Sequence, residues 1–256
     1  MTDLSLSVRA GRVALYLLCG AGALALMSGA GQIWRYYSGT GRFNNIVERF
    51  FVDSEQSIPT WYQVVMLLGC VSIAAFITLL EKGEGGGFVR HWGALAFILA
   101  LLSIDEAVSF HELAGEAMTR YIGSLGFVQY TWVVLGIAVV VAFVVYFRSF
   151  FARLDRRDRR SLGAALALYV AGALGMEIVT GLYVAGRGLV PEGTTDVILD
   201  PFHGIVLTTL EESLEMGGII MLVYALLMYV GRHHPSVAVR LSGAGVEGET
   251  RSSGRS

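Results

Sequence analysis

Six long apolar runs alternate with shorter polar segments along the chain, and each is close to the ~20 residues that cross a hydrocarbon core of about 30 Å. The runs cover approximately residues 13–31, 61–80, 92–112, 127–147, 162–185 and 202–230. They predict an all-α fold, a polytopic membrane bundle of six transmembrane helices over residues 13–231. Residues 1–12 are then a cytoplasmic segment, and 232–256 a cytoplasmic, largely disordered tail. A cleaved signal peptide is the alternative interpretation of the first run.

Composition agrees with a membrane location. The 256 residues are 54% hydrophobic and 16% charged, against roughly 25% charged residues in an average soluble domain. The net charge of −2 and the scatter of basic residues over short loops argue against a nucleic-acid partner. We therefore expect an integral protein of a bacterial plasma membrane with lipid as its partner, and a homo-oligomer or a larger membrane complex stays open.

Arginine and lysine are distributed unevenly between the two ends of the runs. One end carries Arg9, Arg12, Lys82, Arg90, Arg148, Arg153, Arg156, Arg157, Arg159, Arg160, Arg232 and Arg240, and the other Arg35, Arg42, Arg49, Arg120 and Arg187. Short cytoplasmic loops are enriched in these residues. Twelve against five therefore predicts that both termini are cytoplasmic.

The third run ends in the acidic stretch SIDEAVSFHELAGE, residues 103–116. On one continuous helix, Asp105, Ser109, Glu112 and Glu116 would form a single stripe, because residues four and seven apart share a face. Ionisable side chains inside a membrane span are costly and are functional candidates by default. This stripe should therefore be enclosed by other helices.

Acidic residues of three different runs fall at one depth. Counted at 1.5 Å per residue, Asp105, Glu177 and Glu215 all lie roughly 20 to 23 Å from the cytoplasmic boundary. Glu211 and Glu212 are within about one turn of Glu215. The third, fifth and sixth runs should thus bring their carboxylates together in the outer third of the bilayer.

So many carboxylates need a counter-charge, because like charges in a low-dielectric site cannot all ionise. No arginine or lysine lies inside the six runs. A transition metal, mononuclear or binuclear, is the predicted counter-ion, and oxygen ligands with imidazole suit iron, manganese or zinc. The predicted metal ligands are Asp105, Glu106, His111, Glu112, Glu177, Glu211, Glu212 and Glu215. His203 is a further candidate, whereas His91, His233 and His234 are expected to be surface groups.

The nine residues 104–112, IDEAVSFHE, resemble a signature of uncharacterised polytopic bacterial membrane proteins, I-D-E-A-x(3)-H-E. The resemblance implies a polytopic membrane fold and no particular activity.

Three functions fit this pattern. The first is a metal-dependent oxidoreductase or hydrolase that acts on a lipid-like substrate in a water-poor site. The second is a proton or divalent-cation transporter, which would need polar groups through the cytoplasmic half, where they are nearly absent. The third is an accessory subunit of a membrane complex. The small residues Gly163, Ala167, Ala171 and Gly175, spaced four apart, predict a close helix contact on the fifth run.

Overall fold

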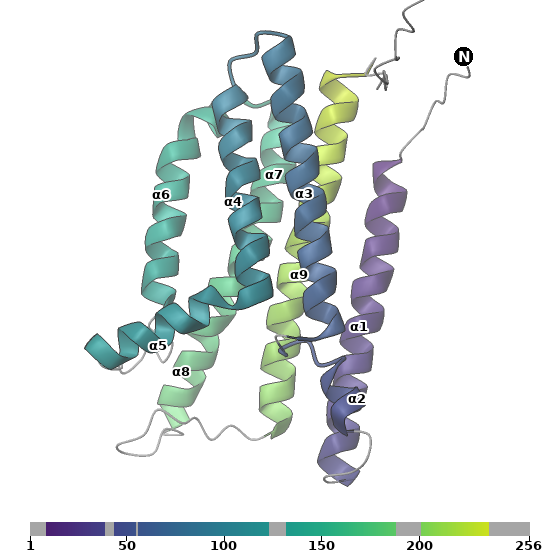
Figure 1. Ribbon diagram of the computed structural model, residues 1–256, viewed down its shortest axis with the longest axis vertical. Coiled ribbons are helices and arrows are strands. Elements are labelled where there is room, and N and C mark those ends of the chain that lie inside the picture. Colours follow the sequence, from purple (N-terminus) through teal and green to yellow (C-terminus); the bar gives the residue numbers. More distant parts are fainter. Residues whose placement is uncertain (1–8, 39–43, 55, 123–131, 188–200, 236–256) are drawn as a thin grey trace, which may run out of the picture.

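The computed structural model describes residues 9–38, 44–54, 56–122, 132–187 and 201–235. Within these ranges all regular structure is helical (Figure 1). The elements are α1 (Ala10–Ser38), α2 (Asn44–Glu48), α3 (Ile58–Gly83), α4 (Val89–Val108), α5 (Phe110–Ile122), α6 (Trp132–Arg153), α7 (Arg156–Val170), the π-helix η1 (Ala171–Met176), α8 (Glu177–Arg187) and α9 (Pro201–His233).

Six helices of the described chain are long and apolar enough to cross a membrane: α1, α3, α4, α6, α9, and the unit in which α7, η1 and α8 follow one another without a break. Large apolar side chains stay exposed along them, as expected for surfaces that face lipid. The predicted all-α fold with six spanning helices is confirmed. The protein is therefore a helical membrane protein.

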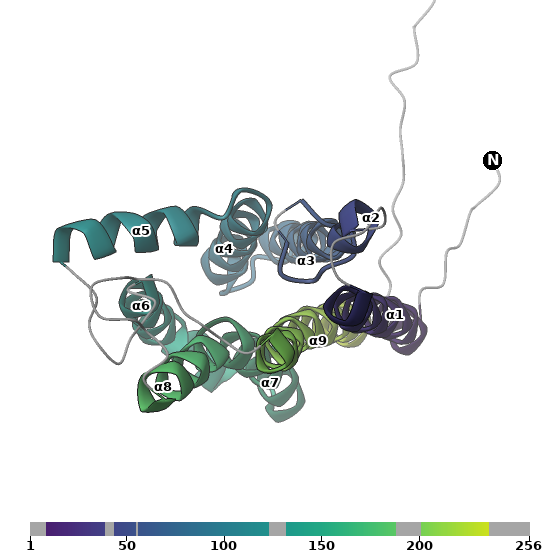
Figure 2. The same ribbon diagram turned by 90° about the horizontal axis from the view of Figure 1, so that it is seen from below.

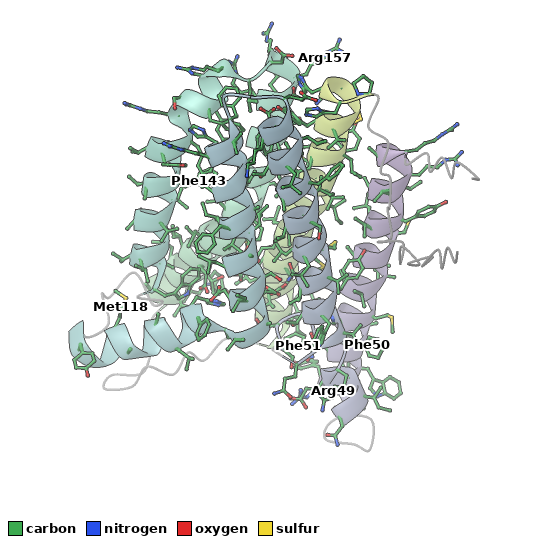
Figure 3. The ribbon with its side chains drawn as sticks, turned by 45° about the horizontal axis from the view of Figure 1, so that its top comes forward. Arg49, Phe50, Phe51, Met118, Phe143 and Arg157 are labelled. Carbon is green, nitrogen blue, oxygen red and sulfur yellow. The ribbon has the colours of Figure 1, made fainter. Side chains whose placement is uncertain are left out.

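The two ends of the bundle differ in charge. The basic end carries Arg153, Arg157 and Arg232, and there α1 begins and α9 ends (Figures 1 and 3). The opposite end carries Asp105, Glu177 and Glu211 and is called the acidic end below. Both described termini of the chain lie at the basic end, as an even number of crossings requires.

The spans form two layers (Figure 2). One layer contains α3 and α4, which make a close antiparallel pair, and the other contains α1, α9 and the α7–η1–α8 unit. Helix α9 packs against α7, α1 and α3 and so occupies the centre. Helix α6 lies at one edge, where it contacts α5 and η1. The core lies at α9, where Met216, Ile219 and Leu226 are fully buried.

Short local sequence features explain where α3 begins and how α3 and α4 are connected. Ser57 caps α3 by accepting a hydrogen bond from the backbone N–H of Thr60 at 3.2 Å, and Pro59 occupies the first turn. The turn between α3 and α4 uses Gly85, whose φ of +70° is the left-handed region that glycine adopts without strain.

The α7–η1–α8 unit approaches α9 through glycines other than the predicted ones. A Cβ added at Gly172 would lie 2.6 Å from Glu215 Cγ, and one at Gly218 would lie 2.5 Å from the backbone nitrogen of Tyr169. At Gly163 a Cβ would meet nothing within 4 Å, and Gly175 would meet only its own helix. The predicted contact face was therefore wrong: Ala167 and Ala171 are exposed, and the residues that meet α9 lie on another side of the α7–η1–α8 unit.

The third span ends earlier than predicted. Helix α4 stops at Val108, and Ser109 has a φ of 52°, the left-handed conformation that ends many helices. Helix α5 then runs across the bundle rather than along it (Figure 1). The prediction of one continuous acidic stripe from Asp105 to Glu116 was therefore wrong.

Several predictions fall outside the described residues. They concern most of the C-terminal tail, the first part of the fourth run at residues 127–131, and Arg42. The backbone of Glu112 and Glu116 belongs to α5, but their side chains are also outside the description.

Candidate functional site

A cavity of about 1150 Å³ opens at the acidic end of the bundle. This volume is at the upper limit of ordinary ligand pockets, which span about 300–1,000 Å³. Its ionisable lining consists of Asp53, Asp105, Glu106, His111, Glu177, Glu211, Glu212, Glu215, Tyr36, Tyr169 and Arg35. Carboxylates of the third, fifth and sixth spans thus surround one space, which we call the acidic cavity.

The break after α4 places His111 beside Asp105. The Asp105 carboxylate accepts a hydrogen bond from the backbone N–H of His111 at 2.9 Å, and its second oxygen lies 2.9 Å from His111 Nδ1. The Asp105 carboxylate therefore fixes both the backbone at the start of α5 and the imidazole ring of His111. The His111 ring packs on Trp132 of α6, with 4.9 Å between ring centroids.

Two neutral side chains hold acids of the cavity. The Trp132 indole N–H donates to Glu177 Oε1 at 3.3 Å. The Gln63 amide of α3 donates to Glu212 Oε2 at 2.6 Å, while the buried oxygen of the same amide has no hydrogen-bond partner. Sequence analysis missed both side chains. Gln63 carried a usable signal, since it is an amide inside an apolar run.

Glu215 stands where α9 meets η1. Its Cγ would touch a side chain at position 172, so only glycine there leaves room for it. Glu215 interacts electrostatically with five other carboxylates, those of Glu106, Glu211, Glu212, Glu177 and Asp105. The cavity is therefore a concentration of negative charge drawn from three spans.

Arg35 is the one arginine or lysine among the described residues that line the cavity. Its helix, α1, extends seven residues beyond the predicted end of the first run, from residue 31 to Ser38. The expectation that no basic residue lies inside a span needs this correction. Arg35 is exposed at the mouth, so its charge is screened by solvent and does not balance the acids deeper in the cavity.

Asp53, in the segment between α2 and α3, adds a carboxylate that sequence analysis did not include. Asp53 is exposed at the cavity, but the protein atoms around its carboxyl displace part of its hydration and raise its pKa to about 6. The preceding residue attaches this segment to α1, because the backbone N–H of Val52 donates a hydrogen bond to Ser28 Oγ at 3.1 Å.

The rest of the cavity is apolar and extends toward the basic end. We call this part the apolar arm. It is lined by Leu95, Ile98, Leu99 and Leu102 of α4, by Leu135, Val139, Val140 and Phe143 of α6, and by Leu166 of α7. Leu95 lies ten residues before Asp105 on α4, which is about 15 Å along the helix.

Two predicted ligands are not placed at the cavity. The side chain of Glu112 lies outside the described residues. The exposed His203 ring stacks on Tyr183 of α8, with 5.7 Å between centroids.

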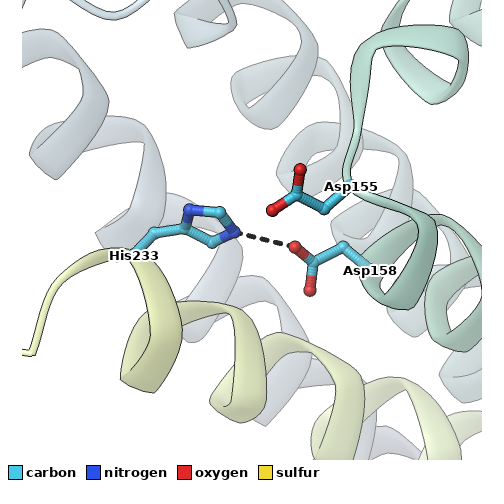
Figure 4. A group of neighbouring side chains, drawn as sticks. All are labelled: Asp155, Asp158 and His233. Carbon is cyan, nitrogen blue, oxygen red and sulfur yellow. Dashed lines mark hydrogen bonds and ion pairs between the residues drawn. The ribbon is translucent and has the colours of Figure 1, made fainter.

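The tightest set of metal-ligating atoms lies at the other end of the bundle. Among the described residues, the only trio of acid and histidine side chains whose ligand atoms all lie within 4.8 Å of one another is Asp155, Asp158 and His233 (Figure 4). This trio could hold a metal ion. No three of the described acid and histidine side chains that line the acidic cavity meet this limit.

Asp158 also makes an ion-paired link between α7 and α9. It is 1% exposed, it accepts a hydrogen bond from Arg232, and its other oxygen lies 2.7 Å from His233 Nε2. A metal ion here would have to share this carboxylate with a guanidinium. The expectation of surface histidines was wrong for His234, which is buried with Nδ1 3.0 Å from Glu84.

The fold and the cavity define a polytopic helical membrane protein with an acidic, partly apolar chamber at one end. The chain belongs to a family described as a domain of unknown function (DUF8692), whose model matches residues 12–230. No curated protein and no solved structure matches the chain.

Proposed function

We propose that the acidic cavity binds one or two transition-metal ions and that the protein is a metal-dependent oxidoreductase or hydrolase acting on a lipid-like substrate. The observation that carries the proposal is the cavity itself. It joins seven carboxylates and an imidazole at one end to an apolar arm at the other. The acidic end of the bundle then faces the cell exterior, as the distribution of arginine suggests.

The donor set fits a metal of this class. Carboxylate oxygens with one imidazole suit iron, manganese or zinc better than copper or a thiolate-type site. In the described conformation the carboxylates are too far apart for three of them to share one ion. Glutamate has three rotatable side-chain bonds, so a bound ion would have to draw Glu106, Glu212 and Glu215 together by changes of rotamer.

His111 is the residue best prepared for its role. Its contact with Asp105 favours the tautomer with the proton on Nδ1 and the lone pair on Nε2, the form of the ring that can bind a metal or accept a proton. A carboxylate behind a metal-binding histidine fixes the ring and raises its basicity. Trp132 covers one side of the ring and restricts water.

A bound metal would supply Lewis acidity and an activated water or oxidant. The protein would orient the substrate and exclude water from the site. The apolar arm holds the substrate chain, and the carboxylates take up positive charge or protons. Transport fits this geometry less well. Beside the arm the described residues form a separate small pocket, whose apolar walls include Leu67, Leu99 and Leu222.

Elemental analysis of protein purified without chelator tests the proposal. We expect stoichiometric iron, manganese or zinc in the wild type and loss of this metal in Glu212→Gln and Glu215→Gln. Asp105→Asn should weaken metal affinity by about 10- to 100-fold, the usual effect of removing the partner of a metal-binding histidine. Glu48→Gln is the matched control, because Glu48 is exposed on α2 and does not line the cavity.

His233→Ala separates the two metal candidates. If this variant loses the metal while Glu212→Gln keeps it, the ion sits at the basic end with Asp155 and Asp158, and the proposal is wrong. Absence of transition metal from a folded wild-type sample would also refute it.

A further inference from the structure

The geometry points to a membrane amphiphile as the substrate: its hydrocarbon chain enters the apolar arm sideways from the bilayer, between α4 and α6, and its polar group stays at the acidic end. This inference rests on the proposed function and adds the class of substrate and its route. Four features of the described residues support it.

The first feature is a window between α4 and α6. At the basic end the two helices are joined by aromatic rings, with 5.2 Å between the centroids of Trp92 and Phe150 and 5.4 Å between those of His91 and Tyr146. At the acidic end, beyond the last residue of α4, His111 of α5 contacts Trp132 of α6. Between these points, side chains of both helices line the cavity instead of filling the space between them.

The second feature is that the cavity reaches the outer surface here. Leu135 and Val139 of α6 line the cavity, yet they are 49% and 57% exposed. Part of this exposed surface faces the cavity, but both residues are about as exposed as Val141, at 56%, which does not line the cavity. A chain in the bilayer could therefore move into the arm without crossing water.

The third feature is length. The arm runs about 15 Å along α4, from Asp105 to Leu95. A hydrocarbon core of about 30 Å gives each leaflet about 15 Å. The arm is thus about as long as one leaflet is thick, but it begins below the outer boundary and crosses the midplane, so a chain held in it extends past its own leaflet.

The fourth feature is helix α5, which lies across the spans at the acidic end (Figures 1 and 2). Phe110, Leu113 and Tyr121 form one exposed apolar stripe on it. A helix that lies across a bundle with such a stripe is typical of the membrane interface. It places the headgroup level next to His111, so a polar group at the acidic end would sit at its normal depth.

Photolabelling tests the inference directly. The protein is reconstituted into phosphatidylcholine vesicles with a diazirine-bearing fatty alcohol or, separately, a diazirine-bearing isoprenoid alcohol. Labelled peptides are then mapped by mass spectrometry. We expect labels on arm-lining residues in segments 95–102 and 135–143. The two probes show whether acyl chains, isoprenoid chains or both are accepted.

Val140→Trp narrows the arm, and Val141→Trp is its control. Val140 lines the arm, whereas Val141 is an exposed neighbour that does not. Labelling of Leu99 and Leu102 should fall about tenfold in Val140→Trp, the effect of losing roughly two buried CH₂ groups. It should stay unchanged in Val141→Trp. Leu102→Trp tests the α4 wall of the arm in the same way, and there the labelling of Val139 is measured.

The outcomes separate this inference from the proposed function. Labels confined to outward side chains such as Val141, Val144 and Val145, or equal loss in Val140→Trp and Val141→Trp, overturn the inference. If metal is bound but the arm is not labelled, the proposed metal site stands without this substrate. Labelling of the arm in metal-free protein supports the lipid chain and refutes the metal site.

Discussion

At Gly218, α9 packs directly against the backbone of α7, and replacement of this glycine by alanine makes a sharp test of the packing. The added Cβ would lie 2.5, 2.7 and 2.8 Å from the backbone N, Cα and Cβ of Tyr169. Because the first two of these are backbone atoms, no rotamer change relieves the overlap. The two helices must separate by several tenths of an ångström. At neighbouring Gly217 the nearest atom would be Leu168 Cδ2 at 3.5 Å, an ordinary contact.

The expected magnitude follows from these distances. Alanine gains about 0.5–1 kcal/mol over glycine inside a helix, and this gain is common to both positions. Overpacking at Gly218 costs about 1–3 kcal/mol. Gly217→Ala should therefore raise the free energy of unfolding by up to about 1 kcal/mol. Gly218→Ala should lower it, and the two variants should differ by about 1–3 kcal/mol.

Reversible unfolding in mixed detergent micelles, followed by circular dichroism, measures both values. A second readout is metal content, since Tyr169 and the adjacent Glu215 line the acidic cavity. Widening of the α7–α9 contact should weaken metal binding in Gly218→Ala alone. Equal free energies of unfolding for the two variants would show that the helices are not this close, and the account of the packing would fail.

Three further predictions concern other parts of the molecule. Asp158→Asn should lower the free energy of unfolding by about 2 kcal/mol, which is less than the loss of a fully buried ion pair because the Arg232 side chain is 28% exposed. A denaturant titration measures this value, with Asp155→Asn as the exposed control. Equal free energies of unfolding for the two variants would contradict the ion pair between Asp158 and Arg232. Ser109→Gly should raise the melting temperature, because a non-glycine residue at a φ of 52° costs about 1 kcal/mol; an unchanged or lower value would refute this. Asp53 has a raised pKa of about 6, so its contribution to stability is complete below its unfolded pKa of about 4 and is lost as pH rises through 6. Asp53→Asn should flatten this part of the stability curve, and an unaltered curve would show that Asp53 ionises normally.

The six spans were readable from the sequence because the hydrophobic requirement of a bilayer acts on about 20 residues at once. The common depth of Asp105, Glu177 and Glu215 was readable for a similar reason. Axial rise is nearly constant along a helix, so counting residues gives height even when the neighbours are unknown. All three residues line one cavity in the structure.

Direction around the helix axis was less predictable than height. A single residue in the left-handed conformation ended α4 at Ser109, and serine is a common residue with no strong preference for that conformation. The predicted stripe depended on a continuous helix through this point. Contacts between residues far apart in the sequence could not be predicted either. Gln63 and Glu212 are 149 positions apart, and the residues of α7 and α9 that meet at Asp158 are also distant in the sequence.

The two departures from α-helical geometry border the same cavity. Ser109 directly precedes the segment that brings His111 onto Asp105, and η1 directly precedes Glu177. A π-helical turn contains one residue more than the α-helical turn it replaces. It therefore rotates all following side chains by about 100° relative to an uninterrupted helix. This rotation sets the direction of Glu177, which meets Trp132, while Gly172 within η1 itself faces Glu215. Departures of this kind from α-helical geometry are frequent at functional sites. Their position on both sides of the acidic cavity is what a site selected for function, and not for packing alone, would produce.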